Sequence, residues 1–391
     1  MKVVKVKKEA EKKIRYFNPW IYKKEIKFLP KSIIPGELVE IYSSDGKFLA
    51  VGYANPKSNI TIRILSFEKR NIDKRFFKER IYKAYIKRKK YIKNSNAYRI
   101  VHSEADGLPG LIVDFYDNYL AVQINTAGME VFRKEILESL IEIIRPFGIY
   151  DKSDPKVRDK EGLYTENKVL YGDVPDKILV KEENLKFYVY LKEGQKTGAF
   201  LDQRKNRKIV SEYVEKGFKV LDLFSNIGGF GILAYKKGAE FVKFVDISQK
   251  VISHLKENIE LNLVKNFEIV KEDVFKFVKK ELLEKREFYD LVIIDPPAFA
   301  KTKYEKQGAV RGFKYLMING LKLLKKDGLL AVFSCSHHIT LDDLKNISLD
   351  VSKDTGFQLE VIEHMYQDID HPYILNIPNS LYLKGLLVRK L

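Results

Sequence analysis

The pattern of hydrophobic and polar residues in the first part of the chain predicts a small β-rich module. Residues 37–42, 48–54 and 60–65 alternate between apolar and polar side chains, and short segments rich in Pro, Gly, Asn and Ser separate them. Such alternation is typical of strands joined by turns. The next stretch, 74–93, places apolar residues at roughly helical spacing on a strongly basic segment, which predicts a connecting helix.

The middle of the chain predicts a mixture of strands and helices. Apolar runs at 110–115 and 119–125 predict strands, and an amphipathic pattern over 129–144 predicts a helix. We therefore expect an α+β domain between the first module and the C-terminal half.

From about Gly217 the pattern changes to short apolar runs that alternate with helical stretches. The runs are 219–223, 241–245, 267–270, 291–294 and 329–333. Alternation of this kind predicts βαβ units on a mostly parallel sheet. Ligands bind beyond the carboxyl ends of such strands, so the residues directly after each run are the candidates for chemistry.

Acidic residues stand at the ends of the first three runs. Asp222 opens a glycine-containing loop that lacks the Gly-x-Gly-x-x-Gly spacing of dinucleotide folds. Asp246 is placed to accept both ribose hydroxyls of a nucleoside, and Asp273 to accept from an adenine amino group. Each alone is more typical of a helix cap or a surface residue. Together they predict a pocket for a cationic adenosine ligand such as S-adenosylmethionine.

The fourth and fifth runs end in residues suited to catalysis on a base. Asp295 precedes two prolines, which lock an extended turn at the strand mouth or simply end the strand, and Phe299 is a candidate for stacking on a base. Cys335 follows the fifth run. A cysteine is commonly a small buried hydrophobe, but this position favours a nucleophile. His337 and His338 are candidates for proton relay or ordinary surface residues.

Charge and composition narrow the classes of protein that remain. Residues 1–31 and 65–93 hold 23 Lys and Arg against 6 Asp and Glu, which accounts for nearly all of the net charge of +18. Basic segments are often only solvated faces, but aromatic residues among these cations favour binding to a polyanion. The single cysteine excludes internal disulfides and multi-cysteine metal or iron–sulfur sites, and no metal is expected. With no apolar run long enough to span a bilayer, we expect a cytoplasmic protein without a membrane partner.

These motifs together resemble the RlmI-type family of large-subunit ribosomal RNA cytosine-5 methyltransferases. The motifs are the run 193–204, the loop that Asp222 opens, the loop from Asp295 to Lys301, and Ser334-Cys335-Ser336. Residues 52–58 are similar to the PUA domain of that family, and residues 102–110 to its central domain. The resemblance covers nearly the whole chain.

The resemblance implies three domains and a set of site residues. We expect a PUA-like RNA-binding domain at 1–70, a basic connector helix with a central α+β domain at 71–192, and a Rossmann-like S-adenosylmethionine-dependent methyltransferase domain at 193–391, whose last strand, 381–388, runs antiparallel. The expected cofactor residues are Lys196, Thr197, Phe200, Asp222, Phe224, Ser225, Asn226, Gly228, Asp246, Ile247, Asp273 and Val274. The expected RNA contacts are Arg204, Phe299 and Lys301.

The resemblance also implies a covalent mechanism on large-subunit ribosomal RNA. Carbon 5 of cytosine is a poor nucleophile until a thiolate, here Cys335, adds to carbon 6, while Asp295 hydrogen-bonds the polar edge of the base. The cysteine count disfavours the two-cysteine cytosine-5 enzymes and the iron–sulfur uracil-5 enzymes. Two alternatives stay open, namely methylation of a guanine or adenine amino group by the Asp295 loop and a non-catalytic role in ribosome assembly. The sequence also leaves open a homodimer and the target nucleotide.

Overall fold

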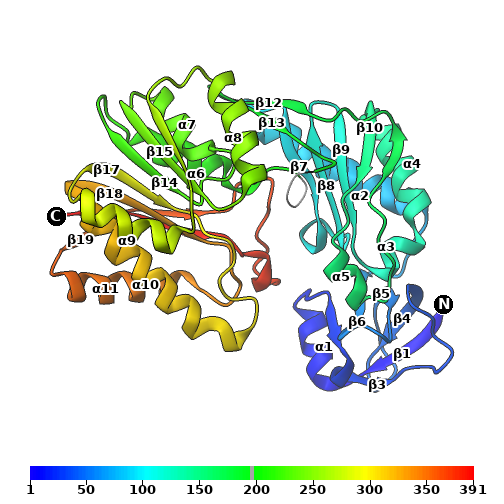
Figure 1. The fold of residues 1–391 in the computed structure, drawn as a ribbon. Coiled ribbons are helices and arrows are strands. Elements are labelled where there is room, and N and C mark those ends of the chain that lie inside the picture. The colour runs from blue at the N-terminus through cyan, green and yellow to red at the C-terminus, as the bar shows by residue number, and fades with distance from the viewer. Residues whose placement is uncertain (194–197) are drawn as a thin grey trace. The chain divides into compact units, whose positions relative to one another are not determined.

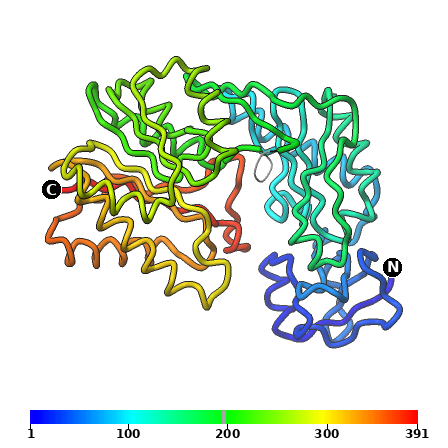
Figure 2. The backbone as a smooth tube through the Cα atoms, in the orientation of Figure 1, coloured from blue at the N-terminus to red at the C-terminus, as the bar shows by residue number. Residues whose placement is uncertain are grey.

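The computed structural model describes residues 1–193 and 198–391, and these form two compact units. The first unit contains Met1–Val180, Val189–Leu201 and Ile369–Ser380, and the second contains Lys181–Tyr188, Asp202–Asp368 and Leu381–Leu391. Figures 1 and 2 follow the chain by colour from its blue N-terminus to its red C-terminus. The chain thus passes from one unit to the other more than once.

The first unit begins with a six-stranded sheet in the order β2-β6-β5-β4-β1-β3. Its elements are β1 (Lys2–Val6), α1 (Lys8–Arg15), β2 (Trp20–Tyr22), η1 (Lys23–Glu25), β3 (Ile26–Phe28), β4 (Glu37–Tyr42), β5 (Phe48–Ala54) and β6 (Ile60–Ser66). The three strands predicted from alternation, β4 to β6, are confirmed. The sequence did not predict β1 to β3, because few apolar residues stand out among the lysines of this segment.

A second sheet of the first unit has the order β11-β10-β9-β8-β7. Its strands are β7 (Ala97–His102), β8 (Leu111–Tyr116), β9 (Tyr119–Ile124), β10 (Gly148–Asp151) and β11 (Val169–Gly172). The helical elements of this part are α2 (Lys74–Tyr91), η2 (Ser103–Asp106), α3 (Ala127–Val131), α4 (Arg133–Ile144) and α5 (Pro155–Lys160). The helix predicted over 129–144 is divided at Phe132, where α3 ends and α4 begins.

Helix α2 packs its apolar side into the core of the first unit. Phe76 and Phe77 are fully buried and belong to a hydrophobic cluster that also contains Val51 and Tyr53 of β5. The N-terminal sheet and the central part therefore share buried contacts. The predicted division of the chain at residues 70 and 192 stays a proposal, based on the separate sheets.

The second unit contains a seven-stranded sheet in the order β16-β15-β14-β17-β18-β20-β19. Its strands are β14 (Lys219–Leu223), β15 (Phe241–Asp246), β16 (Phe267–Lys271), β17 (Tyr289–Ile294), β18 (Leu324–Ser334), β19 (Leu359–Tyr366) and β20 (Lys384–Lys390). The five predicted strands, β14 to β18, run parallel to one another. β20 is antiparallel to both of its neighbours, β18 and β19, so the predicted antiparallel last strand is confirmed.

Helices cover both faces of this sheet, with α6 to α8 on one face and α9 to α11 on the other (Figure 1). They are α6 (Arg204–Glu212), α7 (Gly229–Lys236), α8 (Gln249–Leu261), α9 (Val274–Glu284), α10 (Lys306–Leu323) and α11 (Leu341–Thr355). Of three short helical turns, η3 (Leu201–Gln203) lies where the chain enters the second unit, η4 (Lys303–Glu305) lies within it, and η5 (Pro378–Ser380) belongs to the first unit. A hairpin of β12 (Ile178–Glu182) and β13 (Leu185–Val189) lies where the chain passes between the units. The second unit therefore has the predicted Rossmann-like architecture.

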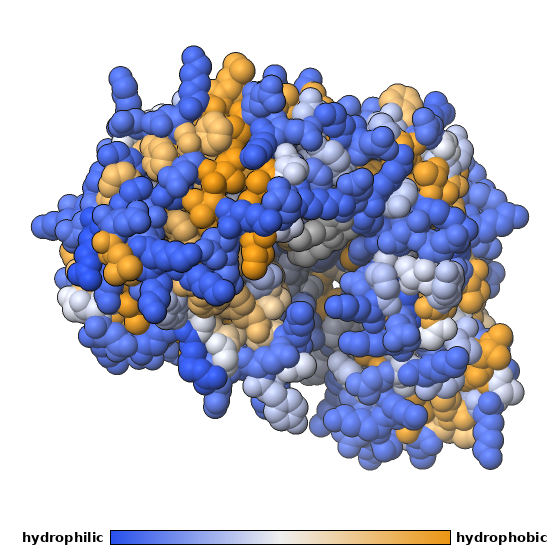
Figure 3. Space-filling model, viewed as in Figure 1, coloured by the Kyte–Doolittle hydropathy of each residue, from blue (hydrophilic) through white to orange (hydrophobic). Residues whose placement is uncertain are grey.

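The face of the protein seen in Figure 3 is mostly hydrophilic, with hydrophobic residues in smaller groups. Among the described residues, no helix has both the length and the hydrophobicity needed to cross a bilayer.

Candidate functional site

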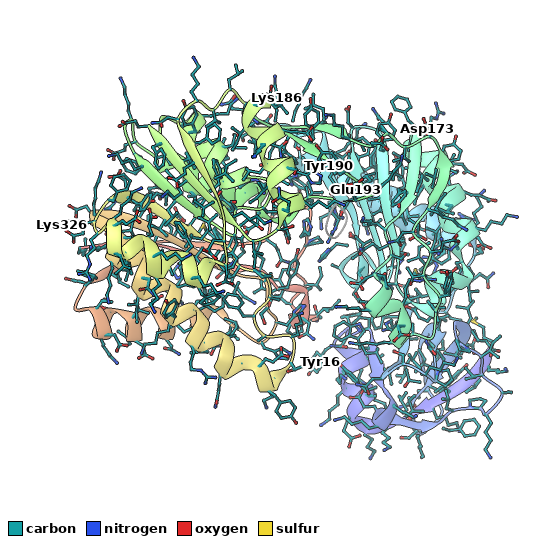
Figure 4. All side chains as sticks on the ribbon, viewed as in Figure 1. Tyr16, Asp173, Lys186, Tyr190, Glu193 and Lys326 are labelled. Atoms are coloured by element: carbon teal, nitrogen blue, oxygen red, sulfur yellow. The ribbon has the colours of Figure 1, made fainter. Side chains whose placement is uncertain are left out.

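The parallel strands of the second unit define the edge of the sheet at which chemistry is expected. Because β14 to β18 run in the same direction, their carboxyl ends meet at one edge. Lys326, which is labelled in Figure 4, lies near the start of β18 and so at the opposite edge. Asp246 ends β15, while Asp295 and Cys335 directly follow β17 and β18. The structure thus brings these three predicted residues to the same edge.

The loop between β14 and α7 has an unusual backbone. Phe224, Asn226 and Gly228 have φ angles of 59°, 48° and 84°. Left-handed conformations are uncommon for residues other than glycine and often occur in functional loops. The backbone N–H of Ser225 donates to a carbonyl at the end of β15, and that of Asn226 donates to Oδ2 of Asp246 at 3.1 Å. The loop is therefore held against the end of β15.

Asp222 is the buried carboxylate beneath this loop, with 1% of its surface exposed. Its Oδ2 accepts a hydrogen bond from the backbone N–H of Gly231 at 2.9 Å. Burial raises the pKa of Asp222 well above its usual value; the bond from Gly231 opposes this, and the charges of Asp295 and Asp246 add to it. The three carboxylates therefore lie close enough to repel one another, and such a cluster favours a cationic ligand.

Gly231 is required where α7 approaches the sheet. A Cβ atom at this position would lie 2.4 Å from the ring of Phe244 and 3.0 Å from Oδ2 of Asp222. Without a side chain, the first turn of α7 comes close enough to donate its N–H to the buried carboxylate.

Asp246 and Asp273 both use part of their carboxylates to hold the backbone. Asp246 also accepts from the N–H of Ser248 at 3.0 Å, and Asp273 caps α9 by accepting from the N–H of Lys276 at 3.1 Å. Asp273 thus takes the helix-capping role that the sequence offered as an alternative. A carboxylate has about four acceptor positions, so both residues keep acceptor capacity for a ligand.

The other predicted cofactor residues differ in their surroundings. Ile247 is exposed directly after β15, whereas Val274, the first residue of α9, has its side chain buried in the core. Phe200 belongs to the first unit. Lys196 and Thr197 lie outside the described residues. A role for any of these residues in cofactor binding stays a prediction.

Asp295 is held by a short chain of hydrogen bonds from the start of α6. Nε2 of Gln203 donates to Oδ1 of Asp295 at 3.0 Å, and Nδ2 of Asn206 donates to Oε1 of Gln203 at 2.6 Å. Both amide side chains are buried. Sequence reasoning singled out neither residue, although Gln203 lies within the run 193–204 that carried part of the family resemblance.

Phe299 packs within an aromatic cluster of the second unit. Its ring centroid lies 5.1 Å from that of Phe313, 5.9 Å from that of Phe275 and 6.1 Å from that of Phe224. The contact with Phe224 joins the loop after β17 to the loop after β14. Stacking of Phe299 on a base stays a prediction.

The two cations predicted to contact RNA differ in their pairing. Arg204 contacts Oδ2 of Asp368 at 2.7 Å through both Nε and Nη2, and both side chains are largely buried. Lys301 is exposed, and its backbone N–H donates to Oε2 of Glu305 at 2.6 Å. The side chain of Lys301 is therefore the more accessible of the two, and the RNA contacts of both stay predictions.

Cys335 lies between two buried serines and is itself partly exposed. Oγ of Ser336 donates to the carbonyl of Ala300 at 2.5 Å, which ties the cysteine segment to the loop that begins at Asp295. Nζ of Lys384 donates to the carbonyl of Ser336 at 2.6 Å. Sequence reasoning missed Lys384, because only the pairing of β18 with β20 brings it beside Cys335.

His337 lies two residues after Cys335, and its side chain is exposed. Partial loss of hydration lowers the pKa of His337, and the charges of Lys384 and His338 lower it further. Its ring centroid lies 6.1 Å from that of Tyr382, whose hydroxyl donates to Asp202 at 2.7 Å. The structure thus places His337 close to the predicted nucleophile, where the sequence left its role open.

Comparison with known families gives two matches along the chain. Residues 4–67 match a PUA-like domain, and residues 165–340 match an S-adenosylmethionine-dependent methyltransferase. A solved structure from Streptococcus mutans, described as a SAM-dependent methyltransferase, has a TM-score of 0.85 at 23% identity over 100% of both chains. A methyltransferase structure complexed with SAH has a TM-score of 0.86 at 24% identity, again over 100% of both chains. These structures share the fold of this chain.

Relatives of known name match over almost the full length. The ribosomal RNA large subunit methyltransferase I of Aeromonas salmonicida is 39% identical in an alignment of 388 positions, which covers 98% of each chain. The protein of the same name from Tolumonas auensis is 38% identical in an alignment of 395 positions, which covers 99% of this chain and 98% of the relative. Both domains found by the family comparison lie within these alignments.

We predict that Asp222→Asn stabilises the second unit increasingly as the pH rises. The folded protein holds the Asp222 proton more tightly than the unfolded chain, so the free energy of unfolding falls as the pH rises above the ordinary pKa of about 3.9. Asparagine does not titrate and avoids this loss. Urea unfolding of both proteins at a series of pH values measures the difference, and a gap that does not change with pH would contradict the prediction.

We predict that Asp246→Ala weakens cofactor binding while the protein stays folded. Loss of hydrogen bonds to a charged group costs about 1.5–3 kcal/mol. Calorimetric titration with S-adenosylmethionine measures the affinity, and thermal unfolding verifies the fold. Asp354→Ala, which removes an exposed carboxylate of α11, is the control and should leave the affinity unchanged. Equal affinities for the two variants would refute the role of Asp246.

Proposed function

The chain belongs to the family of ribosomal RNA large subunit methyltransferase I, and we propose that it methylates carbon 5 of a cytosine in large-subunit ribosomal RNA through a covalent adduct with Cys335. The observation that carries the proposal is that the only thiol of the chain directly follows β18, beside the strand that delivers Asp295. Ser336 ties that segment to the Asp295 loop.

The carboxylates at the edge of the sheet suit S-adenosylmethionine, which supplies a methyl group on a positively charged sulfur. Burial of Asp222 among like charges makes this edge favourable for a cation. Asp246, at the end of β15, is the acceptor proposed for the ribose hydroxyls. Asp273 is the acceptor proposed for the adenine amino group, in addition to its role as the N-terminal cap of α9. The donors and acceptors on this edge therefore fit the ligand.

Cys335 performs the nucleophilic steps of the proposed reaction. Its thiolate forms a bond to carbon 6 of the cytosine, and the electron pair displaced from the ring makes carbon 5 nucleophilic. Once carbon 5 carries the methyl group, a base removes the carbon 5 proton. The bond between sulfur and carbon 6 then breaks, and the thiolate is regenerated.

Asp295 orients the base in this proposal. The carboxylate follows β17 directly, and Gln203 donates to one of its oxygens. Hydrogen bonds from the polar edge of cytosine to this carboxylate would stabilise the adduct. The target base has to leave its stack to reach the site, which costs a few kcal/mol.

The exposed face of α2 is the surface proposed to hold the surrounding RNA, together with the PUA-like domain. Part of its charge is already paired, because Lys74 and Lys78 form ion pairs with Glu142 of α4. The other exposed lysines of α2 and of the residues directly after it are Lys83, Lys87, Lys89, Lys90 and Lys93. Tyr82 and Tyr91 are exposed among them, which suits stacking on unpaired bases.

A ribosomal RNA substrate implies a cytoplasmic site of action, and we propose that location. A homodimer stays a prediction, and light scattering on the purified protein tests it.

We predict that Cys335→Ala abolishes methyl transfer and leaves cofactor binding intact, because other strand ends build the cofactor site. Mass mapping of nucleosides after incubation with unmodified ribosomal RNA measures the transfer. A 5-fluorocytosine at the target position should trap the wild-type enzyme on RNA, since fluorine cannot leave as the proton does.

The two alternatives give different outcomes in the same experiment. Methylation of an amino group leaves Cys335→Ala active and forms no adduct. A non-catalytic assembly factor gives no methyl transfer even for the wild-type protein. Activity of Cys335→Ala would therefore overturn the cytosine-5 mechanism.

We predict that replacing the five exposed lysines of α2 and its C-terminal extension by glutamine reduces both RNA affinity and its dependence on salt. Each lost phosphate contact lowers the slope of log affinity against log salt by about 0.7–0.9. The double variant Lys74→Gln, Lys78→Gln is the matched control, because these two cations are already paired. An unchanged slope for the five-fold variant would exclude this face. Deletion of residues 1–70 is a poorer test, since it would expose the shared core.

A further inference from the structure

Lys384 is a buried lysine beside the proposed nucleophile. It begins β20, where its Cα pairs with that of Ser334 at the end of β18, and 4% of its surface is exposed. Its Nζ donates to the carbonyl of Ser336 at 2.6 Å. The lysine thus reaches across the segment Ser334-Cys335-Ser336 and is fixed there by a hydrogen bond.

Other titratable groups surround this amine. On the loop after β18 these are Cys335, His337 and His338, and on α11 the group is Asp343. Asp343 pairs with Lys306 at 2.8 Å and accepts from Thr340, so its charge is balanced locally. On β19, Tyr366 is the register partner of Lys384. Cys335 is therefore the ionisable neighbour of Lys384 that has a role in the proposed reaction.

The surroundings adjust the basicity of Lys384. Burial lowers its pKa to about 8, while the negative charges of Cys335 and Asp343 oppose the shift. The neutral amine, which can accept a proton from a neighbouring thiol, is therefore more populated near neutral pH than in an ordinary lysine, whose pKa is about 10.4. An ordinary thiol has a pKa of about 8.5, so it needs a nearby base or cation to become a thiolate at neutral pH.

We propose that Lys384 activates Cys335 by accepting the thiol proton and holding the thiolate as an ion pair. The proposal rests on the proposed function, in which Cys335 is the nucleophile. Lys384 acts through Cys335 and is therefore a positioning residue.

The proton transfer balances without any further reactant. The bond between sulfur and hydrogen breaks, a bond between nitrogen and hydrogen forms, and the neutral amine becomes an ammonium ion next to the thiolate. The ammonium ion remains while sulfur is bonded to carbon 6. When the adduct breaks down, the thiolate returns to its ammonium partner, and the ion pair is ready for the next base.

The titration of Cys335 tests the proposal directly in the protein without RNA. Because the chain has a single cysteine, the rate of alkylation by iodoacetamide against pH reports the pKa of this thiol alone. In the wild-type protein we expect that pKa to lie below the ordinary value. In Lys384→Met it should rise, and the alkylation rate at neutral pH should fall about tenfold for each unit of change.

A second buried lysine of β20 provides the matched control. Nζ of Lys390 donates to the carbonyl of Leu324 at 2.7 Å and pairs with Glu287, at the far end of the strand from Cys335. Lys390→Met removes a buried ammonium group from the same strand, so it reports any general effect of such a loss. We expect the pKa of Cys335 to be unchanged in this variant.

The reciprocal experiment does not depend on the folding of Lys384→Met. In Cys335→Ala the thiolate no longer stabilises the ammonium group, so the pKa of Lys384 should fall. The pH dependence of acylation of Lys384, followed by mass spectrometry, measures this shift. An unchanged pKa of Cys335 in folded Lys384→Met would overturn the proposal, and so would an unchanged pKa of Lys384 in Cys335→Ala.

Failure of this inference can be told apart from failure of the proposed function. If Cys335→Ala remains active in methyl transfer, the nucleophile is wrong, whatever the titrations show. If Cys335→Ala is inactive but Lys384→Met keeps both the wild-type thiol pKa and the wild-type kcat, the nucleophile stands and Lys384 is excluded. The proposed function and the role of Lys384 are both supported if Lys384→Met has a lower kcat, an unchanged affinity for the cofactor and a pH profile of activity shifted to higher pH.

Discussion

Burial of a carboxylate at the carboxyl ends of the parallel strands is the constraint on which the second unit depends. Asp222 is buried, and Asp246 and Asp295 lie near enough for their charges to disfavour its ionisation. The surrounding structure offsets part of this cost with hydrogen bonds. The first turn of α7 donates to Asp222, the loop backbone donates to Asp246, and Gln203 donates to Asp295. A cluster of carboxylates suits a cationic ligand. Gly231 and the left-handed residues of the loop after β14 let the backbone come close to these carboxylates.

The sequence predicted the parts of this unit that depend on local patterns. β14 and β17 are short runs of buried apolar residues bounded by loops, so periodicity alone located them and the acids at their ends. β19 was not predicted, because most of its residues are partly or fully exposed and give no continuous apolar run. In the first unit, β1 to β3 were not predicted for a similar reason, because lysines interrupt their apolar residues.

The side chains that support the site could not be predicted, since their partners are distant in sequence. Gln203 meets Asp295, and Lys384 meets the segment around Cys335, only after the sheet order has been set. Arg204, whose contact with RNA stays a prediction, also pairs with Asp368, and no local pattern indicates this pairing. Residue type and strand position thus predict candidate residues for the chemistry, whereas the side chains that contact these candidates depend on the tertiary fold.

β20, the last strand in the sequence, lies between β18 and β19 in the sheet, so these two strands are joined only through it. The segment beside Cys335 meets Lys384 only where β20 pairs with β18. The activation of the thiol that we propose therefore depends on a long-range pairing, which local folding of β14 to β18 does not supply.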